Sequence, residues 1–260
     1  TLAEAIMPTI FVALIGILSW QVSWYVSIIM SILILASVRF LAKTERNKGT
    51  KLQKENQQVG MLKKSWKRSE MLRSWVFWAA VPGLMTSPMI TTTLFFHQVH
   101  LVEIKSWDLS TYVLFIPAYS AATLFSLYLI GYLVDKLSTK IILPVFLFPL
   151  ISGLLLLSIA TSYLELLFVF ILLGLSAGAY TVVYGTFFPE FFGSLYLGSV
   201  RTVGVTIMVF SSAIGPVLSG YFIDLGYLID HQFKFFAAFS VFASLLFLTI
   251  NLRVKLPENA

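Results

Sequence analysis

Long stretches without any aspartate, glutamate, lysine or arginine dominate this sequence and limit what it can fold into. Six such runs fill its second part, at residues 75–98, 109–134, 141–164, 166–189, 202–223 and 235–252. They have roughly the 20 apolar residues that a helix needs to cross a bilayer. Only 12% of the residues are charged and 58% are hydrophobic, whereas about a quarter of a soluble domain is charged. We therefore predict an all-α fold, a polytopic transmembrane helix bundle.

The first part of the chain holds one uncharged run of 34 residues, from residue 5 to residue 38. As a single helix it would be about 50 Å long, whereas the hydrocarbon core of a bilayer is about 30 Å thick. Gly16 and the polar residues within 19–23 mark a tight reversal, because glycine and short polar side chains favour turns. The prediction is therefore eight spans, of which the first is truncated.

The distribution of lysine and arginine predicts the orientation, since short loops rich in these residues stay cytoplasmic. The opposite, external set of loops contains only Lys105 and Lys234. Sixteen of the eighteen basic residues lie in the loops or ends at residues 39–73, 135–140, 190–201 and 253–260. The long connector and both chain ends are therefore predicted to be cytoplasmic, and the membrane to be a bacterial inner (plasma) membrane.

Charge and residue usage also exclude several function classes. The net charge of +6 sits mainly in the connector, which favours lipid headgroups over nucleic acid as the partner. The absence of cysteine excludes disulfides, thiolate metal sites and cysteine nucleophiles. The three histidines, His97, His100 and His231, are not spaced as a metal site, and no phosphate-binding loop or nucleophile elbow is present. We expect no cofactor, no metal and no enzymatic activity.

The sequence GYLVDKLSTK, residues 131–140, lies between two predicted spans. It is similar to the G-x-L-x-D-[RK]-x-G-[RK]-[RK] motif of the major facilitator superfamily, a family of membrane transporters. The matching positions are Gly131, Leu133, Asp135, Lys136 and Lys140, whereas Ser138 and Thr139 depart from the motif. In addition, GVTIMVFSSAIGPVLSG resembles the glycine–proline signature of this family through Gly215, Pro216 and Gly220, and FFPEFFGSLYLGSVRT places Glu190 and Arg201 where the family has them.

The resemblance implies the C-terminal half plus helices 5 and 6 of a twelve-span transporter. Residues 1–42 would be the last two helices of an N-terminal bundle, residues 43–73 a cytoplasmic loop, and residues 74–260 the C-terminal six-helix bundle. The implied function is a permease, a symporter or antiporter, that moves a small organic solute by alternating access and is coupled to a proton or counter-solute. Its other partners would be membrane lipids and the missing N-terminal helices. A non-transporting sensor or scaffold and an integral-membrane enzyme are the alternatives.

The motif residues suggest a cytoplasmic gate. Gly131 is expected to allow two helices to approach closely. Asp135 is expected either to accept hydrogen bonds from the amino end of a neighbouring helix or to pair with Arg201, with Glu190 nearby. The alternative for Lys136 and Lys140 is that they only set the orientation.

Polar residues at membrane depth are candidates for the transport pathway, because burying them there is costly. Glu4 is a candidate proton carrier; the alternative is a structural hydrogen bond or ion pair. The helix over 75–98 contains Pro82, Gly83 and Pro88, and is our candidate gating helix because freed carbonyls must face protein, water or substrate. On it, Thr91 is a candidate substrate contact.

Four further candidates have equally plain structural alternatives. His97 would titrate or bind cargo, or simply form a hydrogen bond near the membrane surface. Tyr119, Tyr180 and Tyr184 would line a cavity and offer hydroxyl groups to a solute, or only pack. Gly174 and Gly178, just before the last two tyrosines, lie one turn apart, and small residues at this spacing are typical of close helix packing.

A polar stretch of the connector, VGMLKKSWKRSEML, allows two interpretations. Leu62 and Trp66 are four residues apart with basic residues between them, as in a short amphipathic helix lying on an anionic leaflet. The other interpretation is an ordinary basic linker.

Overall fold

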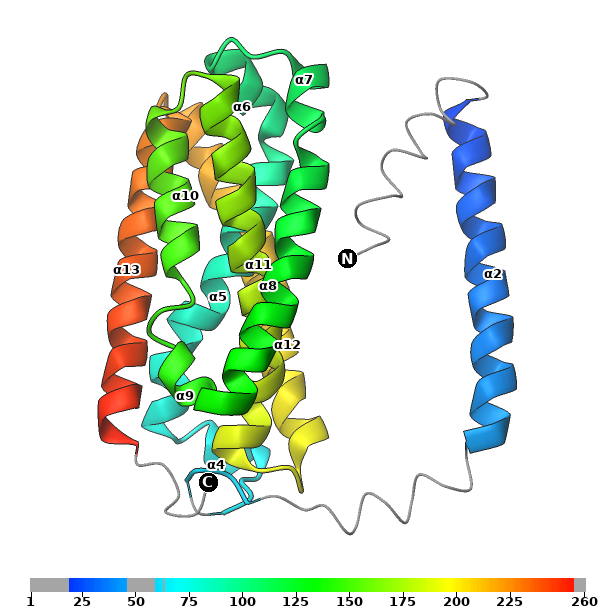
Figure 1. Ribbon diagram of the computed structural model, residues 1–260, viewed down its shortest axis with the longest axis vertical. Coiled ribbons are helices and arrows are strands. Elements are labelled where there is room, and N and C mark those ends of the chain that lie inside the picture. The colour runs from blue at the N-terminus through cyan, green and yellow to red at the C-terminus, as the bar shows by residue number, and fades with distance from the viewer. Residues whose placement is uncertain (1–18, 46–58, 63, 255–260) are drawn as a thin grey trace. The chain divides into compact units, whose positions relative to one another are not determined.

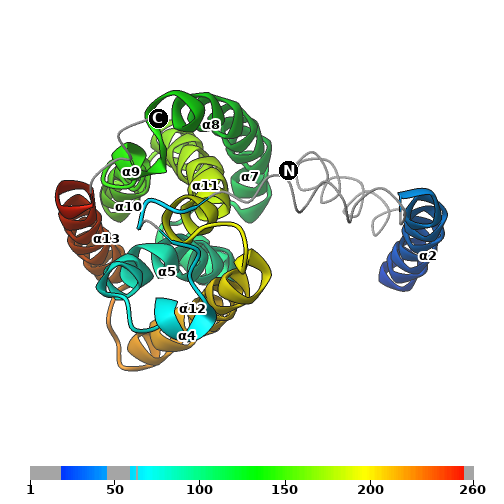
Figure 2. The ribbon, with the colours of Figure 1, turned by 90° about the horizontal axis from the view of Figure 1, so that it is seen from below.

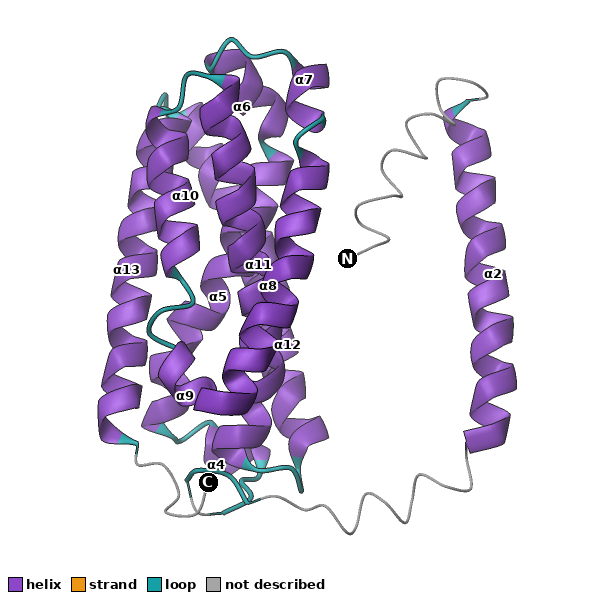
Figure 3. Ribbon diagram, viewed as in Figure 1, coloured by secondary structure: helices purple, strands orange, loops and turns teal. Residues whose placement is uncertain are grey.

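The computed structural model describes residues 19–45, 59–62 and 64–254. The chain divides into two compact units, residues 1–57 and residues 58–260. Within the described residues every regular element is a helix (Figure 3). The predicted all-α class is therefore confirmed.

The described part of the first unit is one helix, α2 (Trp20–Glu45). It begins inside the predicted reversal, with the Val22 N–H 3.5 Å from the Ser19 hydroxyl oxygen. Its apolar side chains, such as Ile32 and Leu33, are about 60% exposed within this unit. The helix continues to Glu45, and so includes the first residues that the charge pattern assigned to the connector. The first predicted span and Glu4 lie outside the described residues.

The second unit is a bundle of long helices joined by short ones (Figure 1). Among the described residues, five stretches are long and apolar enough to cross a membrane. They lie at Trp75–Phe96, Leu109–Leu137, Tyr163–Phe192, Leu197–Asp224 and Ile229–Arg253. The helices of the unit are α4 (Arg68–Met71), α5 (Trp75–Phe96), α6 (Gln98–Ile104), α7 (Leu109–Val113), α8 (Ile116–Leu137), α9 (Thr139–Ile142), α10 (Phe148–Ile159), α11 (Tyr163–Phe192), α12 (Leu197–Asp224) and α13 (Ile229–Arg253). The count of eight spans stays a prediction.

The predicted span at residues 141–164 is not one continuous helix. α9 ends at Ile142 and α10 begins at Phe148. Pro144 and Pro149 lie at this break, and neither can donate the backbone hydrogen bond that a continuous helix needs. The carbonyl of Pro144 accepts a hydrogen bond from the Ser244 hydroxyl on α13 instead. The interruption is thus stabilised from a neighbouring helix.

Small residues set the closest helix contacts. α11 packs along α8, and α12 packs along α5 (Figure 2). A Cβ atom added at Gly174 or Gly178 would overlap a backbone carbonyl of α8, and one added at Gly215 would overlap the Met89 carbonyl of α5. Close packing at Gly174 and Gly178 is therefore confirmed, and the proline-containing helices α5 and α12 are held together in the same way.

Polar contacts fix the loops at the predicted external end. Lys105 forms an ion pair with Asp230 at 3.0 Å, and the Lys105 side chain is only 8% exposed. Asp108 caps α7 by accepting hydrogen bonds from the Thr111 N–H, at 2.7 Å, and the Thr111 hydroxyl, at 2.9 Å. The backbone hydrogen bond from Thr111, followed by the hydroxyl bond, lowers the pKa of Asp108 below its usual value.

Candidate functional site

The motif turn between α8 and α9 has an unusual backbone. Ser138 closes α8 with φ of 72° and ψ of 153°, a region of backbone space that is populated almost only by glycine. The motif of the resembling family has glycine at this position, and the conformation explains why. Ser138 therefore adopts the backbone of the motif despite its side chain.

The strain at Ser138 gives a stability prediction. Its hydroxyl is buried, and no residue in the described part of the chain forms a hydrogen bond with it. We expect Ser138→Gly to raise the free energy of unfolding by about 1–3 kcal/mol, because it relieves a strained conformation. Thermal unfolding in detergent measures the change, with Ser199→Gly as the control at an exposed position. A lower melting temperature for Ser138→Gly would contradict the strain at this turn.

Glu190, near the end of α11, binds the start of α9. One carboxylate oxygen accepts the Thr139 N–H at 3.0 Å, and the other accepts the Thr139 hydroxyl at 2.6 Å. Thr139 is fully buried. Since the first N–H groups of a helix have no partner within that helix, the carboxylate supplies an acceptor that α9 lacks. Glu190 therefore ties the motif turn to α11.

Asp135 and Gly131 do not form the contacts expected of them. The expected ion pair between Asp135 and Arg201 is not formed among the described residues, and the carboxylate at the amino end of a helix is that of Glu190. Asp135 lies one turn after Gly131 on α8 and is exposed. A Cβ atom at Gly131 would have no described atom within 4 Å. This face of α8 is thus open within the second unit.

Two basic residues of the predicted gate lie over aromatic rings instead of acidic groups. The Arg201 guanidinium lies 5.9 Å from the ring centre of Tyr184, and the Lys136 ammonium lies 4.5 Å from that of Tyr132. A cation over an aromatic face is attracted by the ring quadrupole. Arg201 consequently connects the gate end of α12 to a tyrosine of α11.

The connector caps α11 at the same end of the bundle. Met61 N–H donates to the Glu190 carbonyl at 2.7 Å, and Trp66 N–H donates to the Phe192 carbonyl at 2.8 Å. The last carbonyls of a helix lack partners within the helix. The Trp66 ring also packs edge-on against Phe192, with centroids 5.9 Å apart. The short amphipathic helix is not formed at Leu62 and Trp66, because residues 59–62 and 64–66 are non-helical and their N–H groups bind the end of α11. The basic linker stays a prediction.

The short helix α4 lies within this stretch and carries its one acidic residue. Glu70 accepts hydrogen bonds from the Lys67 N–H at 2.9 Å and the Lys64 ammonium at 3.0 Å. These two contacts, the backbone one first, lower the pKa of Glu70 below its usual value. The carboxylate therefore stays ionised at neutral pH beside the basic residues of the connector.

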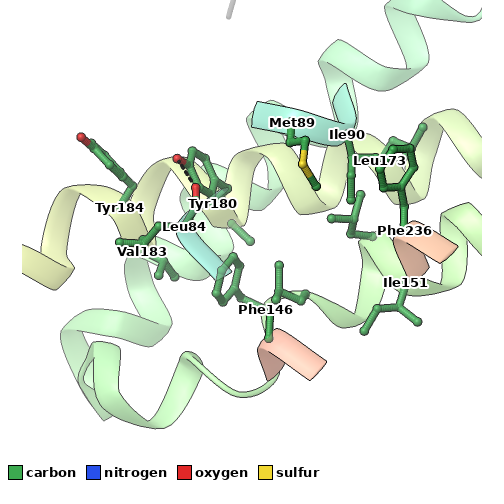
Figure 4. Close-up of a cluster of buried hydrophobic side chains, with 14 of the residues drawn as sticks. Leu84, Met89, Ile90, Phe146, Ile151, Leu173, Tyr180, Val183, Tyr184 and Phe236 are labelled. Carbon is green, nitrogen blue, oxygen red and sulfur yellow. Dashed lines mark hydrogen bonds between the residues drawn. The ribbon is translucent and has the colours of Figure 1, made fainter. Parts of the chain in front are cut away.

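A second cluster lies where α5 meets α11, away from the helix ends. Pro88 has no N–H group, so the carbonyl of Leu84, four residues earlier, has no partner within α5. The Tyr180 hydroxyl of α11 donates to this carbonyl at 3.0 Å (Figure 4). The freed carbonyl expected on the candidate gating helix therefore faces protein, and the tyrosine links the two helices.

Tyr184 extends this cluster by one turn along α11. Its ring stacks on that of Tyr180, with centroids 5.7 Å apart and an angle of 29° between the planes. Its side chain is buried, and its hydroxyl has no hydrogen-bond partner among the described residues. The Ser176 hydroxyl, one turn before Tyr180, is in the same state. One face of α11 thus carries two buried hydroxyls that have no hydrogen-bond partner among the described residues.

The remaining candidates lie apart from these clusters. Thr91 is half-buried on α5, two turns beyond Leu84. Tyr119 packs edge-on against Phe95, with centroids 5.7 Å apart, and its carbonyl lies against Gly174. Thr91 thus lies on α5 and Tyr119 on α8.

His97 at the end of α5 forms a structural contact with α12. Its Nε2 atom lies 3.0 Å from the Pro216 carbonyl, and since a carbonyl only accepts, Nε2 carries the hydrogen. The ring also lies over Gly220, whose added Cβ would be 3.5 Å away. The geometry therefore fits the alternative in which His97 simply forms a hydrogen bond, and its partner is α12.

The Leu84–Tyr180 contact makes a prediction with a matched control. Tyr180→Phe is expected to lower the free energy of unfolding by about 1–3 kcal/mol, because it leaves a buried carbonyl without a donor. Tyr184→Phe, one turn away, removes a buried hydroxyl that has no partner among the described residues, and we expect no loss of stability. In a Pro88→Ala background the cost of Tyr180→Phe should disappear, since residue 88 then supplies the N–H. Thermal unfolding of the wild type, of the three single variants and of the Pro88→Ala, Tyr180→Phe double variant measures these effects.

These features define the class of the protein as an α-helical, multi-pass membrane protein. The family model of the Major Facilitator Superfamily matches it twice, over residues 1–151 and 98–259. Comparison with curated proteins and with solved structures finds no match. Because the two family matches together cover almost the whole chain, it belongs to the major facilitator superfamily, whose members bind small molecules and move them across membranes.

Proposed function

We propose that this chain is part of a secondary active transporter that moves a small organic solute by alternating access, coupled to a proton. One observation carries the proposal: where the proline-interrupted helix α5 meets α11, two stacked tyrosines meet, and the buried hydroxyl of Tyr184 has no partner among the described residues. A buried hydroxyl without a partner is costly. A solute that bonds to Tyr184 removes that cost.

The inner cluster supports a gate. Glu190 joins α11, which carries the tyrosines, to the motif turn after α8. Arg201 on α12 lies over Tyr184 of the same helix α11. A rotation of α11 that accompanies solute binding would therefore be passed to the motif turn, in the manner of two-state rocking. Gly131 and Asp135, which form an open face, are proposed to meet the rest of the transporter in one of the two states.

The choice of cargo follows from the charges. No lysine or arginine lies in the middle of a described span, and a carboxylate substrate would favour a buried cationic partner. A neutral or cationic solute fits the tyrosine hydroxyls and aromatic rings better. Glu4 remains our proposed proton carrier, on sequence grounds alone.

The experiment compares Tyr184→Phe with the wild-type protein in proteoliposomes, using a panel of radiolabelled neutral and cationic solutes and an imposed pH gradient. For the solute that the wild type transports, we expect the initial rate to fall about tenfold, the effect of one hydrogen bond to a buried partner. The melting temperature should not fall. Thr181→Val is the control, since the exposed Thr181 hydroxyl bonds only to its own helix.

Three results would remove the proposal. If Tyr184→Phe transports the solute at the wild-type rate, the Tyr184 hydroxyl does not bind the substrate. Solute binding without flux in the wild type would favour the sensor or scaffold alternative, and product formation would favour the enzyme. Loss of pH-driven accumulation in Glu4→Gln, with downhill flux retained, is expected if Glu4 carries the proton.

A further inference from the structure

A cavity of about 350 Å³ lies between the end of α12 and the beginning of α13. These two helix ends meet at the same end of the bundle, opposite the connector (Figure 1). The cavity lining combines aromatic and aliphatic side chains, among them Leu218, Phe222, Tyr227 and Phe235, with the polar side chains of Ser219, His231 and Gln232. It is separate from the tyrosine cluster on α11, and its role goes beyond the proposed transport function.

Two polar side chains of the cavity are buried and only partly satisfied. Ser219 is 1% exposed and Gln232 is 7% exposed. The Ser219 hydroxyl donates to Gln232 Oε1 at 2.6 Å. Gln232 Nε2 has two hydrogens, and its contact with the Tyr227 carbonyl is 3.5 Å long, beyond the usual 2.7–3.2 Å or so of an N–H to oxygen bond. The amide therefore has a donor available for a carbonyl oxygen of a ligand.

The walls of the cavity are apolar and open to the outside of the unit. Phe222 is 41% exposed, Tyr227 57% and Phe235 70%. A polar solute would gain little free energy of binding from such walls. A lipid acyl chain, in contrast, would cover their apolar surface. The shape and chemistry thus favour an amphipathic occupant with one hydrogen-bond acceptor.

The depth of the cavity identifies where such an occupant comes from. Ser219 precedes the last residue of α12 by five positions, and Gln232 follows the first residue of α13 by three. At 1.5 Å per residue these positions lie roughly 5–8 Å from the helix ends. The polar interface of a bilayer is about 5–7 Å thick on each side, so Gln232 lies at the depth of the ester groups of a glycerolipid.

We propose that this cavity binds a glycerolipid from the leaflet on the predicted external side. Gln232 Nε2 donates to an ester carbonyl of the lipid, and an acyl chain lies over Phe222 and Phe235. The cavity volume is at the low end of the range for small-molecule sites, which is roughly 300–1,000 Å³. It therefore receives the ester region of the lipid and leaves the rest of the chains in the bilayer.

Photolabelling of the full protein tests the site. The protein is purified in detergent, mixed with a phosphatidylethanolamine that carries a diazirine near the start of one acyl chain, irradiated, and digested for mass spectrometry. We expect adducts within residues 218–236. Gln232→Leu should lower them about fivefold, the equivalent of one neutral hydrogen bond. Asn251→Leu, the matched amide substitution at the other end of α13, should leave them unchanged.

A second variant distinguishes the loss of the lipid contact from unfolding of the protein. Leu218→Trp fills the cavity and keeps the Ser219–Gln232 bond, and it should lower the labelling to a similar extent with an unchanged melting temperature. Wild-type labelling in either folded variant overturns the proposal. A photoreactive amino acid placed at position 235 gives a further test in native membranes. If it crosslinks to another segment of the protein, protein covers the cavity and the proposal is overturned.

Discussion

Replacing Gly178 by valine is expected to prevent the second unit from folding, or to lower its free energy of unfolding by about 3 kcal/mol or more, the upper end for overpacked sites. A Cβ atom at this position would overlap the Thr123 carbonyl and lie 2.7 Å from Ser126 Cβ. The nearest atoms belong to the backbone and first side-chain carbon of α8, which cannot rotate away. Yield of monodisperse protein and thermal unfolding in detergent measure the loss.

Gly185, on the same helix two turns later, is the matched control. Within the described part of the chain, nothing lies within 4 Å of a Cβ atom added there. Gly185→Ala should therefore be neutral or stabilising by up to about 1 kcal/mol, because alanine is the better helix former. If Gly178→Ala and Gly185→Ala shift the melting temperature equally, the close contact between α8 and α11 does not exist in solution.

Glu190→Ala is expected to have the second-largest effect, a loss of about 3 kcal/mol in the free energy of unfolding. The substitution leaves the N–H of the buried Thr139 without an acceptor, and leaves its hydroxyl with only the Thr186 hydroxyl oxygen, 2.6 Å away. Each hydrogen bond to a charged group contributes about 1.5–3 kcal/mol. If the proposed gate is correct, solute flux also falls, because α11 no longer holds the motif turn.

A double-mutant cycle separates the specific contact from general damage. Thr139→Val removes the hydroxyl and keeps the N–H bond to Glu190. Residues that share a hydrogen bond show coupling of about 0.5–3 kcal/mol, whereas distant residues are additive. We expect coupling between Glu190→Gln and Thr139→Val, and none between Glu190→Gln and Thr181→Val. Additive effects in the first pair would show that the carboxylate acts elsewhere.

The positions of the long helices could be predicted from the sequence, because crossing a bilayer requires long apolar runs and charges mark their ends. α5 and α12 begin and end within a few residues of the predicted runs. Close packing at Gly174 and Gly178 was equally accessible, since small residues one turn apart form one face of a helix. Hydropathy could not reveal the break before α10, because both sides of it are apolar. Pro144 and Pro149 were the available signal.

The partners within the candidate site could not be predicted in the same way. Two carboxylates and one arginine were assigned to the gate, but their spacing along the chain does not determine which of them reaches a helix end. Thr139 was treated only as a departure from the motif, yet it donates both hydrogen bonds to Glu190. Only the acceptor of the Leu84–Tyr180 hydrogen bond could be predicted from the sequence, because a proline always leaves the carbonyl four residues earlier without its helical donor.

The docked connector changes where this protein can be divided. Composition places the end of the linker at residue 73, just before the first apolar run of the second unit. However, Met61, Leu62 and Trp66 supply the N–H groups for the terminal carbonyls of α11, and Gly60 lies so close to the Phe191 carbonyl that a side chain would not fit. A shortened protein that starts at residue 74 would leave the terminal carbonyls of α11 without these N–H donors. A shortened protein intended to contain only the second unit has to start before Gly60.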